Sequence, residues 1–294
     1  MNAKGMTIKS KTNSILPPRN SHNVAQLVSK QPSVYDLHIH TQFSPDSSTP
    51  LDTYAQVAEH SSIHIGFLDH LELAFFHRTG FLNHDNLPDL LETYDQVHQR
   101  YPHTSLGLEV DFYSDQSSAV AEFCDEYRKD FDYLIGTVHT IDRLAVTVKE
   151  ELELLINRIG LSECVHQYFD EVGEAIESKL FDGIAHIDGV MRFVPLFHPN
   201  TKLLEFWRQR TLELGKQCQK NGILIEINLS GLIRPWKRTH PSKDLIEELV
   251  QAGAQFFVGS DSHSLMDFKN AIPYLRQFHE FLERQNGLAL PMSI

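Results

Sequence analysis

Seven short apolar, strand-like segments alternate with helix-like segments after residue 33. The strand-like segments are residues 33–39, 63–68, 105–112, 133–138, 181–187, 223–229 and 255–259. The helix-like segments begin near residue 50 and then cover residues 88–100, 117–129, 163–178, 202–220, 242–251 and 267–284. Such alternation predicts a parallel sheet, and seven units predict an α/β fold that closes, or nearly closes, into a barrel. Thr49 is the expected N-cap of the first helix, with Pro50 at its first position.

Residues 1–32 precede this alternation and differ from it in composition. They are rich in Ser, Asn and Lys, contain Pro17 and Pro18, and carry five basic residues but no acidic one. We therefore predict a disordered leader at residues 1–32 and a barrel domain at residues 33–294. An organelle transit peptide is the alternative, because such peptides are also basic, Ser-rich and poor in acidic residues.

Length and charge exclude several classes of protein. The chain has 294 residues, of which 41% are hydrophobic, so it can bury a sizeable barrel core. Its 39 acidic and 26 basic residues give a net charge of -13, which disfavours nucleic acid as a partner. The three cysteines form no CxxC pair, and no apolar run approaches the ~18 residues of a membrane span. These features favour a cytoplasmic protein without membrane contact.

Two histidines on the first predicted strand indicate a metal site. His38 and His40 are two residues apart, and side chains at that spacing point to the same face of a strand. Imidazole is a common ligand of Zn, Mn and Fe. Alone, the pair could equally be chance or core packing, so its meaning depends on the rest of the chain.

Further His, Asp and Glu residues follow the other predicted strands. In chain order the groups are His38 and His40, Asp69 and His70, Glu109 and Asp111, His139, His186 and Asp188, Glu226 and Asn228, and Asp261 and His263. Any one of these could be structural, for example a buried core histidine or a surface carboxylate. Together they track the carboxyl ends of the strands, where a β/α barrel carries its active site.

The mixture of donors indicates more than one metal ion. Neutral imidazoles and carboxylates suit Zn, Mn or Fe, and seven or eight donors exceed the need of one ion. We therefore predict two to three divalent ions, with Glu109 and a hydroxide as the natural bridges between them. Ions this close together can activate water and hold phosphate oxygens at the same time.

The sequence resembles the PHP (polymerase and histidinol phosphatase) family over roughly residues 34–290. The motifs that carry the resemblance are Asp36-x-His38-x-His40-Thr41, Asp69-His70, Gly107-Leu108-Glu109, Gly136-Thr137-Val138-His139, Ala185-His186-Ile187-Asp188, Glu226-Ile227-Asn228 and Gly259-Ser260-Asp261-Ser262-His263. Within the family the chain looks most like the monofunctional histidinol-phosphate phosphatases. Its size, the Thr41-x-x-Ser44-x-Asp46 continuation and the Glu-x-Asn-x-Ser-Gly stretch at 226–231 point to that branch.

The resemblance implies a distorted (β/α)7 barrel of the TIM-like kind with a trinuclear metal site. Carried over motif by motif, the ligands would be His38, His40, Glu109 and Asp261 for the first metal, Glu109, His139 and His186 for the second, and Asp46, His70 and His263 for the third. Asp46 stands where several members of the family have His, and we interpret it as a marker of the phosphatase branch. Leu68 replaces the Thr that usually precedes the Asp-His motif.

Three arginines are candidates for binding substrate phosphate, because guanidinium groups can contact phosphate oxygens in pairs. Arg192 follows His186 by six residues, and Arg234 and Arg143 lie in other loops after strands. Each could instead form a surface salt bridge. Asp36 is expected either to orient a ligand histidine or to cap a strand end.

The resulting hypothesis is a metal-dependent phosphomonoesterase acting on L-histidinol phosphate in histidine biosynthesis, by attack of a metal-activated hydroxide. Catalytic roles are assigned to Glu109, Asp261 and His70. The alternatives are another small phosphate ester as substrate, a nucleic-acid-processing exonuclease module, or an inactive metal-binding protein. The acidic charge counts against the exonuclease.

Overall fold

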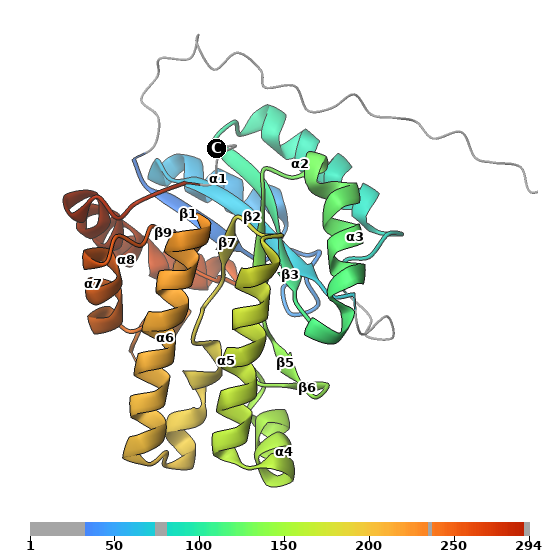
Figure 1. The fold of residues 1–294 in the computed structure, drawn as a ribbon. Coiled ribbons are helices and arrows are strands. Elements are labelled where there is room, and N and C mark those ends of the chain that lie inside the picture. Colours follow the sequence, from blue (N-terminus) through green and yellow to red (C-terminus); the bar gives the residue numbers. More distant parts are fainter. Residues whose placement is uncertain (1–32, 74–80, 235–236, 291–294) are drawn as a thin grey trace, which may run out of the picture.

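The computed structural model describes residues 33–73, 81–234 and 237–290, and its main sheet has seven parallel strands. These strands are β1 Tyr35–Ile39, β2 His64–Leu71, β3 Thr104–Asp111, β4 Tyr133–Thr137, β7 Gly183–Ile184, β8 Leu224–Asn228 and β9 Phe256–Gly259. They lie in sequence order in the sheet, with the helices packed around its outside (Figure 1). A strand lies at each of the seven predicted positions, although the one predicted at residues 181–187 is reduced to Gly183–Ile184. The predicted leader at residues 1–32 lies outside the described residues.

The first and last strands meet at their carboxyl ends and close the sheet. The His40 amide donates a hydrogen bond to the Ser262 carbonyl oxygen at 3.0 Å, and the Asp261 amide donates to the His38 carbonyl oxygen at 2.9 Å. Closure is uneven, because β7 has only two residues and the register between β1 and β2 is irregular. The predicted fold, a distorted seven-stranded α/β barrel, is therefore confirmed.

The helices lie close to their predicted positions. They are α1 Leu51–Ser61, α2 Leu87–Arg100, α3 Ser117–Tyr127, α5 Leu161–Ser178, α6 Thr201–Asn221, α7 Lys243–Gln251 and α8 Leu265–Gln285. The expected N-cap of α1 is wrong: Pro50 holds that position in an extended conformation, with ψ of 149°. Its carbonyl oxygen accepts a hydrogen bond from the Thr53 amide at 3.1 Å, so the helix begins one residue later than predicted. Within the described residues, no helix is both long and apolar enough to span a membrane.

Several smaller elements were not predicted. Between β4 and α5 the chain adds a two-stranded hairpin, β5 Thr140–Ile141 and β6 Leu144–Ala145, and a helix, α4 Lys149–Ile159. Short 3-10 helices are η2 Ser114–Gln116, η3 Arg128–Asp130, η4 Gly189–Arg192, η5 Val194–Phe197 and η6 Ser230–Ile233. Of these, η4 and η6 follow β7 and β8 directly, so they shape the end of the barrel where the predicted ligands lie.

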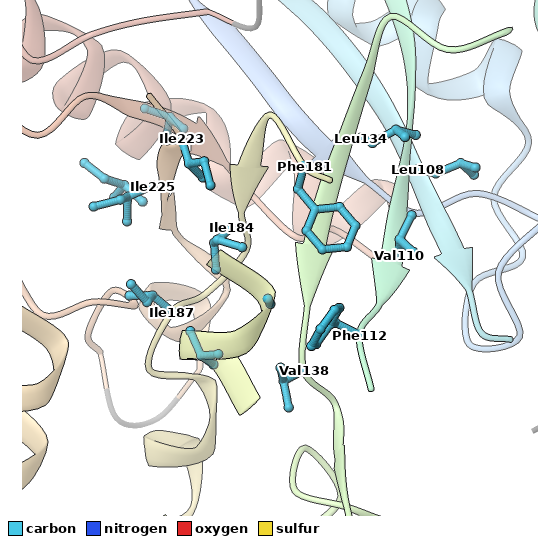
Figure 2. Close-up of a cluster of buried hydrophobic side chains, with 14 of the residues drawn as sticks. Leu108, Val110, Phe112, Leu134, Val138, Phe181, Ile184, Ile187, Ile223 and Ile225 are labelled. Carbon is cyan, nitrogen blue, oxygen red and sulfur yellow. The ribbon is translucent and has the colours of Figure 1, made fainter. Parts of the chain in front are cut away.

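The outer face of the sheet forms the main hydrophobic core with the helices. Figure 2 shows Leu108, Val110 and Phe112 around β3 packing near Leu134 and Phe181. These side chains are almost completely buried. Burial of a large apolar side chain contributes roughly 1.5–3 kcal/mol, so this layer supplies much of the stability that holds the strand ends in place.

Inside the barrel the side chains change from apolar to polar along the strands. A second buried cluster contains Leu68, Leu224 and Tyr133, and the Tyr133 hydroxyl donates to the Leu37 carbonyl oxygen at 3.0 Å. A Cβ at Gly107 would collide with the Tyr133 ring, so this glycine makes room for it. Residues two further along the same strands as the two leucines are His70 and Glu226. The apolar layer thus supports a polar layer directly above it.

Candidate metal centre

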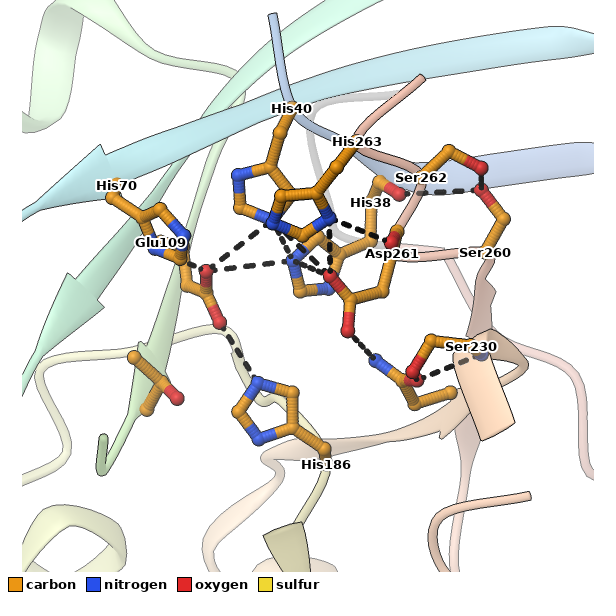
Figure 3. Close-up of polar contacts among 12 residues, drawn as sticks. His38, His40, His70, Glu109, His186, Ser230, Ser260, Asp261, Ser262 and His263 are labelled. Atoms are coloured by element: carbon orange, nitrogen blue, oxygen red, sulfur yellow. Dashed lines mark hydrogen bonds and ion pairs between the residues drawn. The ribbon is translucent and has the colours of Figure 1, made fainter. Parts of the chain in front are cut away.

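All nine predicted metal ligands lie in this polar layer. They are His38, His40, Asp46, His70, Glu109, His139, His186, Asp261 and His263, and each lies within 4 Å of another member through nitrogen or oxygen atoms. Figure 3 shows the side chains of His38, His40 and Asp261 converging from the two strands that close the barrel. Residues far apart in sequence thus meet at one end of the sheet.

The first group of donors contains His38, His40 and Asp261. The Nε2 atoms of the two imidazoles are 3.0 Å apart, and Asp261 Oδ1 lies 3.3 Å from His40 Nε2. The Nδ1 atoms point elsewhere, to Glu226 for His38 and to Ser44 for His40. Since zinc–nitrogen bonds measure about 2.0–2.1 Å, two nitrogens on one tetrahedral ion lie roughly 3.3 Å apart. This group has the spacing and the free lone pairs of a metal site.

The second group surrounds Glu109 Oε1. His186 Nε2 lies 3.0 Å from this oxygen and His139 Nε2 lies 3.4 Å from it. Asp111 holds His139 in place. Its carboxylate accepts a hydrogen bond from the His139 backbone amide at 2.9 Å and lies 3.3 Å from His139 Nδ1. Glu109 is buried, so its carboxylate requires cationic partners at this position.

The third group is Asp46, His70 and His263, with His40 beside it. Asp46 Oδ2 lies 3.1 Å from His263 Nε2 and 3.7 Å from His70 Nε2, so the aspartate stands in a donor position. His70 also reaches the second group, because its Nδ1 lies 2.8 Å from Glu109 Oε2. The donor sets therefore share His70 and His40, whereas the predicted assignment shared only Glu109 between two metals.

Glu109 Oε2 tests whether these residues fit a metal. It lies 2.8 Å from His70 Nδ1, 3.5 Å from His38 Nε2 and 3.6 Å from His40 Nε2. None of these contacts has hydrogen-bond geometry, so within the described residues the oxygen is buried without a hydrogen-bond partner. One carboxylate oxygen and three imidazole nitrogens converge here without forming hydrogen bonds to one another through that oxygen. This arrangement fits coordination of a divalent cation better than a hydrogen-bond network.

Electrostatics favour the ligand forms of Glu109 and His40. Burial raises the pKa of Glu109, but the neighbouring imidazoles, His139 first among them, hold that pKa well below its usual value. Burial and the neighbouring imidazoles of His263 and His70 hold the pKa of His40 well below its usual value. An ionised Glu109 and a neutral His40 are the forms that bind metals.

Other strand-end carboxylates support the centre without joining it. Asp69 accepts from the Thr41 amide and from the Ser44 hydroxyl, each at 2.6 Å, and Ser44 Oγ lies 3.0 Å from His40 Nδ1. Because Ser44 gives its proton to Asp69, it accepts from His40 and leaves the His40 Nε2 lone pair free. Asp188 lies further out, 2.9 Å from His240 Nδ1.

Asp36 contacts backbone rather than a ligand ring. Its Oδ1 accepts from the Ser260 amide at 2.7 Å and from the His38 amide at 3.4 Å. Of the two interpretations left open by the sequence, this favours capping of the strand end. The carboxylate that meets a ligand imidazole is Glu226, 2.7 Å from His38 Nδ1.

The three candidate arginines differ in position. Arg192 lies in η4, and its Nη2 is 3.3 Å from both Asp261 Oδ2 and Ser230 Oγ, so it stands beside the first donor group. Arg234 and Arg143 are exposed, and in the described part of the chain neither forms an ion pair with the centre.

The sequence did not point to a further arginine, Arg238. Its guanidinium donates a hydrogen bond to the Met191 carbonyl oxygen at 2.5 Å, which stabilises the segment that carries Arg192. Its only sequence signal is the local run of basic residues.

The chain is similar to known proteins in sequence and in fold. Residues 36–230 match the model of the PHP domain. A histidinol-phosphatase of Bacillus subtilis is 27% identical over 277 residues, covering 85% of this chain and 98% of the relative. A solved histidinol phosphate phosphatase of Lactococcus lactis, complexed with Zn, L-histidinol and phosphate, has a TM-score of 0.66 at 20% identity and covers 83% of this chain and 93% of its own. A solved HisK protein of Listeria monocytogenes has a TM-score of 0.72 at 19% identity, covering 79% and 96%.

Proposed function

The chain belongs to the PHP domain family, and from this membership and the site we propose that it is a metal-dependent phosphomonoesterase that hydrolyses L-histidinol phosphate to L-histidinol and phosphate. The observation that carries the proposal is the convergence of nine donor residues, with Glu109 among them, at the carboxyl end of the barrel. The choice of substrate is supported by the histidinol phosphatases that this chain resembles over most of its length.

The donor set supports two to three divalent ions. Mixed imidazole and carboxylate ligands suit Zn, Mn or Fe, and the zinc complex of the Lactococcus lactis protein makes zinc the first ion to test. Bound here, such ions would supply an activated water and polarise the phosphoryl oxygens. His38, His40, Glu109 and Asp261 would hold them at the buried end of the centre, while Asp46 and His263 lie at its more exposed side.

The chain's own groups would orient the phosphate. Arg192 can donate to a phosphoryl oxygen while Asp261 and Ser230 keep its guanidinium in place. Glu109 and Asp261 keep the charges of the donor groups balanced. His70, with 13% of its side chain exposed, borders the second and third groups. It is our candidate to exchange a proton with the leaving oxygen, through its Nε2 when that nitrogen holds no ion.

A steady-state comparison tests the substrate. L-Histidinol phosphate should give the highest kcat/KM in a panel of small phosphomonoesters that includes a generic aryl phosphate. A higher kcat/KM for another ester would identify that ester as the preferred substrate, and the proposed phosphomonoesterase activity would still hold. Cleavage of single-stranded oligonucleotides without hydrolysis of these monoesters would point to a nuclease, which the net charge of -13 disfavours.

Arg192→Ala should lower kcat/KM for the phosphate ester by about tenfold to hundredfold, because a charge-assisted hydrogen bond is worth about 1.5–3 kcal/mol. Inorganic phosphate should inhibit the variant more weakly than the parent. Arg284→Ala is the matched control, since Arg284 is exposed on α8 and pairs with Glu280 at 3.2 Å. Parent-like kinetics of Arg192→Ala at sub-saturating substrate would show that another group binds the phosphate.

The same assay decides the two remaining arginine predictions. Arg234 and Arg143 stay candidates for substrate binding, although both are exposed. If either one contacts the phosphate, its alanine variant should raise KM and weaken phosphate inhibition. An alanine variant that behaves like Arg284→Ala would remove that residue from the proposed site.

A further inference from the structure

Glu226 is a completely buried carboxylate on β8 that contacts two different parts of the centre. Its Oε1 lies 2.7 Å from His38 Nδ1. Its Oε2 accepts a hydrogen bond from the His186 backbone amide at 2.8 Å. His38 belongs to the first donor group and His186 to the second, so one side chain connects both.

The contact with His38 fixes the form of that imidazole. A carboxylate accepts hydrogen bonds and cannot donate them, so the proton of His38 must sit on Nδ1. The Nε2 lone pair then faces His40 and Asp261, at 3.0 and 3.9 Å. A carboxylate on the far nitrogen also makes an imidazole a stronger metal ligand.

Asn228 continues the connection toward Asp261. Its Nδ2 group donates to Glu226 Oε2 at 3.1 Å and to Asp261 Oδ2 at 3.2 Å. Its Oδ1 accepts from the Ser230 amide and hydroxyl, at 3.0 and 2.6 Å, which sets the orientation of the amide. Glu226 and Asn228 thus hold His38, Asp261 and His186 in a fixed relation.

The surrounding backbone is shaped for this contact. A Cβ at Gly259 would collide with Glu226 Oε1 and lie 2.5 Å from His38 Cβ. Only glycine lets β9 pass this close to the pair. The close packing leaves Glu226 little freedom to move, so its carboxylate stays between its three donors.

We propose that Glu226, with Asn228, is a positioning residue that sets the metal affinity of the centre. The proposal rests on the metal-dependent function above and adds residues that are not themselves ligands. It follows from the three hydrogen bonds of one buried carboxylate to groups in both donor sets.

The test is the zinc affinity of the full chain, measured without substrate by competition with a chromophoric chelator. Glu226→Gln keeps the shape but has one acceptor oxygen, so its amide NH2 must face either His38 or the His186 amide. Zinc should bind about 10–100-fold more weakly, as is typical when a group that orients a metal ligand is changed. Excess zinc should restore turnover, which would not follow from damage to the substrate site.

Asp36→Asn is the matched control, because Asp36 is equally buried but accepts from backbone amides. It should lower the melting temperature of the metal-free protein while zinc affinity stays close to that of the parent. Asn228→Ala should weaken zinc binding less than Glu226→Gln, and it decides the matter if Glu226→Gln does not fold.

Parent-like zinc affinity in a folded Glu226→Gln, or in Asn228→Ala where only that variant folds, would overturn the positioning role. Equal losses of zinc affinity in Glu226→Gln and Asp36→Asn would overturn it as well, because the effect would then be common to buried carboxylates and not specific to Glu226. Because zinc is measured without substrate, a parent that binds zinc but does not hydrolyse histidinol phosphate would count against the proposed function alone.

Discussion

Glu109→Gln should lower kcat by at least about 10³-fold, equivalent to about 4 kcal/mol of transition-state stabilisation, while the fold survives. The carboxylate lies within 3.6 Å of five imidazoles through its two oxygens. The amide of glutamine has the same size but carries no charge. Its NH2 group cannot bind a metal ion and would occupy the place of an oxygen ligand. Both the balance of charge and the bridge between donor groups are lost.

Asp261→Asn should act in the same direction, since Asp261 Oδ1 completes the first donor group and Oδ2 holds Arg192. The measurements are kcat, metal content by elemental analysis and melting temperature. Glu213→Gln is a control, because Glu213 is an exposed carboxylate paired with Arg210. Near-normal turnover of Glu109→Gln with a full complement of metal would show that this residue is not the central ligand.

The fold could be predicted because each strand of a closed parallel sheet is buried on both faces and so has an apolar sequence. The prediction failed where burial is not the deciding factor. Residues 181–187 look like one strand, yet β7 ends at Ile184 because His186, with φ of 24°, turns its imidazole toward Glu109. The unit after β4 contains α4 as well as α5, and seven-fold alternation gives no reason to expect a second helix there.

The site could be predicted as a set of residues but not as a set of contacts. Parallel strands bring their carboxyl ends together, so side chains that follow apolar runs must meet whatever their order. Which carboxylate orients His38 depends on packing across the barrel. Asp36 is near in sequence but bonds backbone amides, whereas Glu226 is 188 residues away and faces the ring. Sequence distance likewise does not separate Arg192 from Arg234 or Arg143.

Removal of metal by a chelator should abolish activity and lower the melting temperature of the full chain. Glu109 Oε2 is buried with no hydrogen-bond partner among the described residues, and Nε2 of His38 lies 3.0 Å from Nε2 of His40, so a cation is expected to stabilise these groups. Each ion that binds only the folded chain would stabilise it by about 4 kcal/mol at a free concentration of 1,000 times Kd. Losing two to three such ions should therefore destabilise the protein strongly.

Elemental analysis of the active protein should give two to three transition-metal ions per chain, and zinc added after dialysis should restore both turnover and melting temperature. The buried donors around Glu109 should lose metal last, because solvent reaches them least, whereas Asp46 is half exposed at the third group. Stepwise chelation would then give two phases, with the melting temperature falling mainly in the second. Full activity with one ion per chain would contradict the multinuclear proposal, because the shared contacts of Glu109, His70 and His40 would then have no second ion to hold.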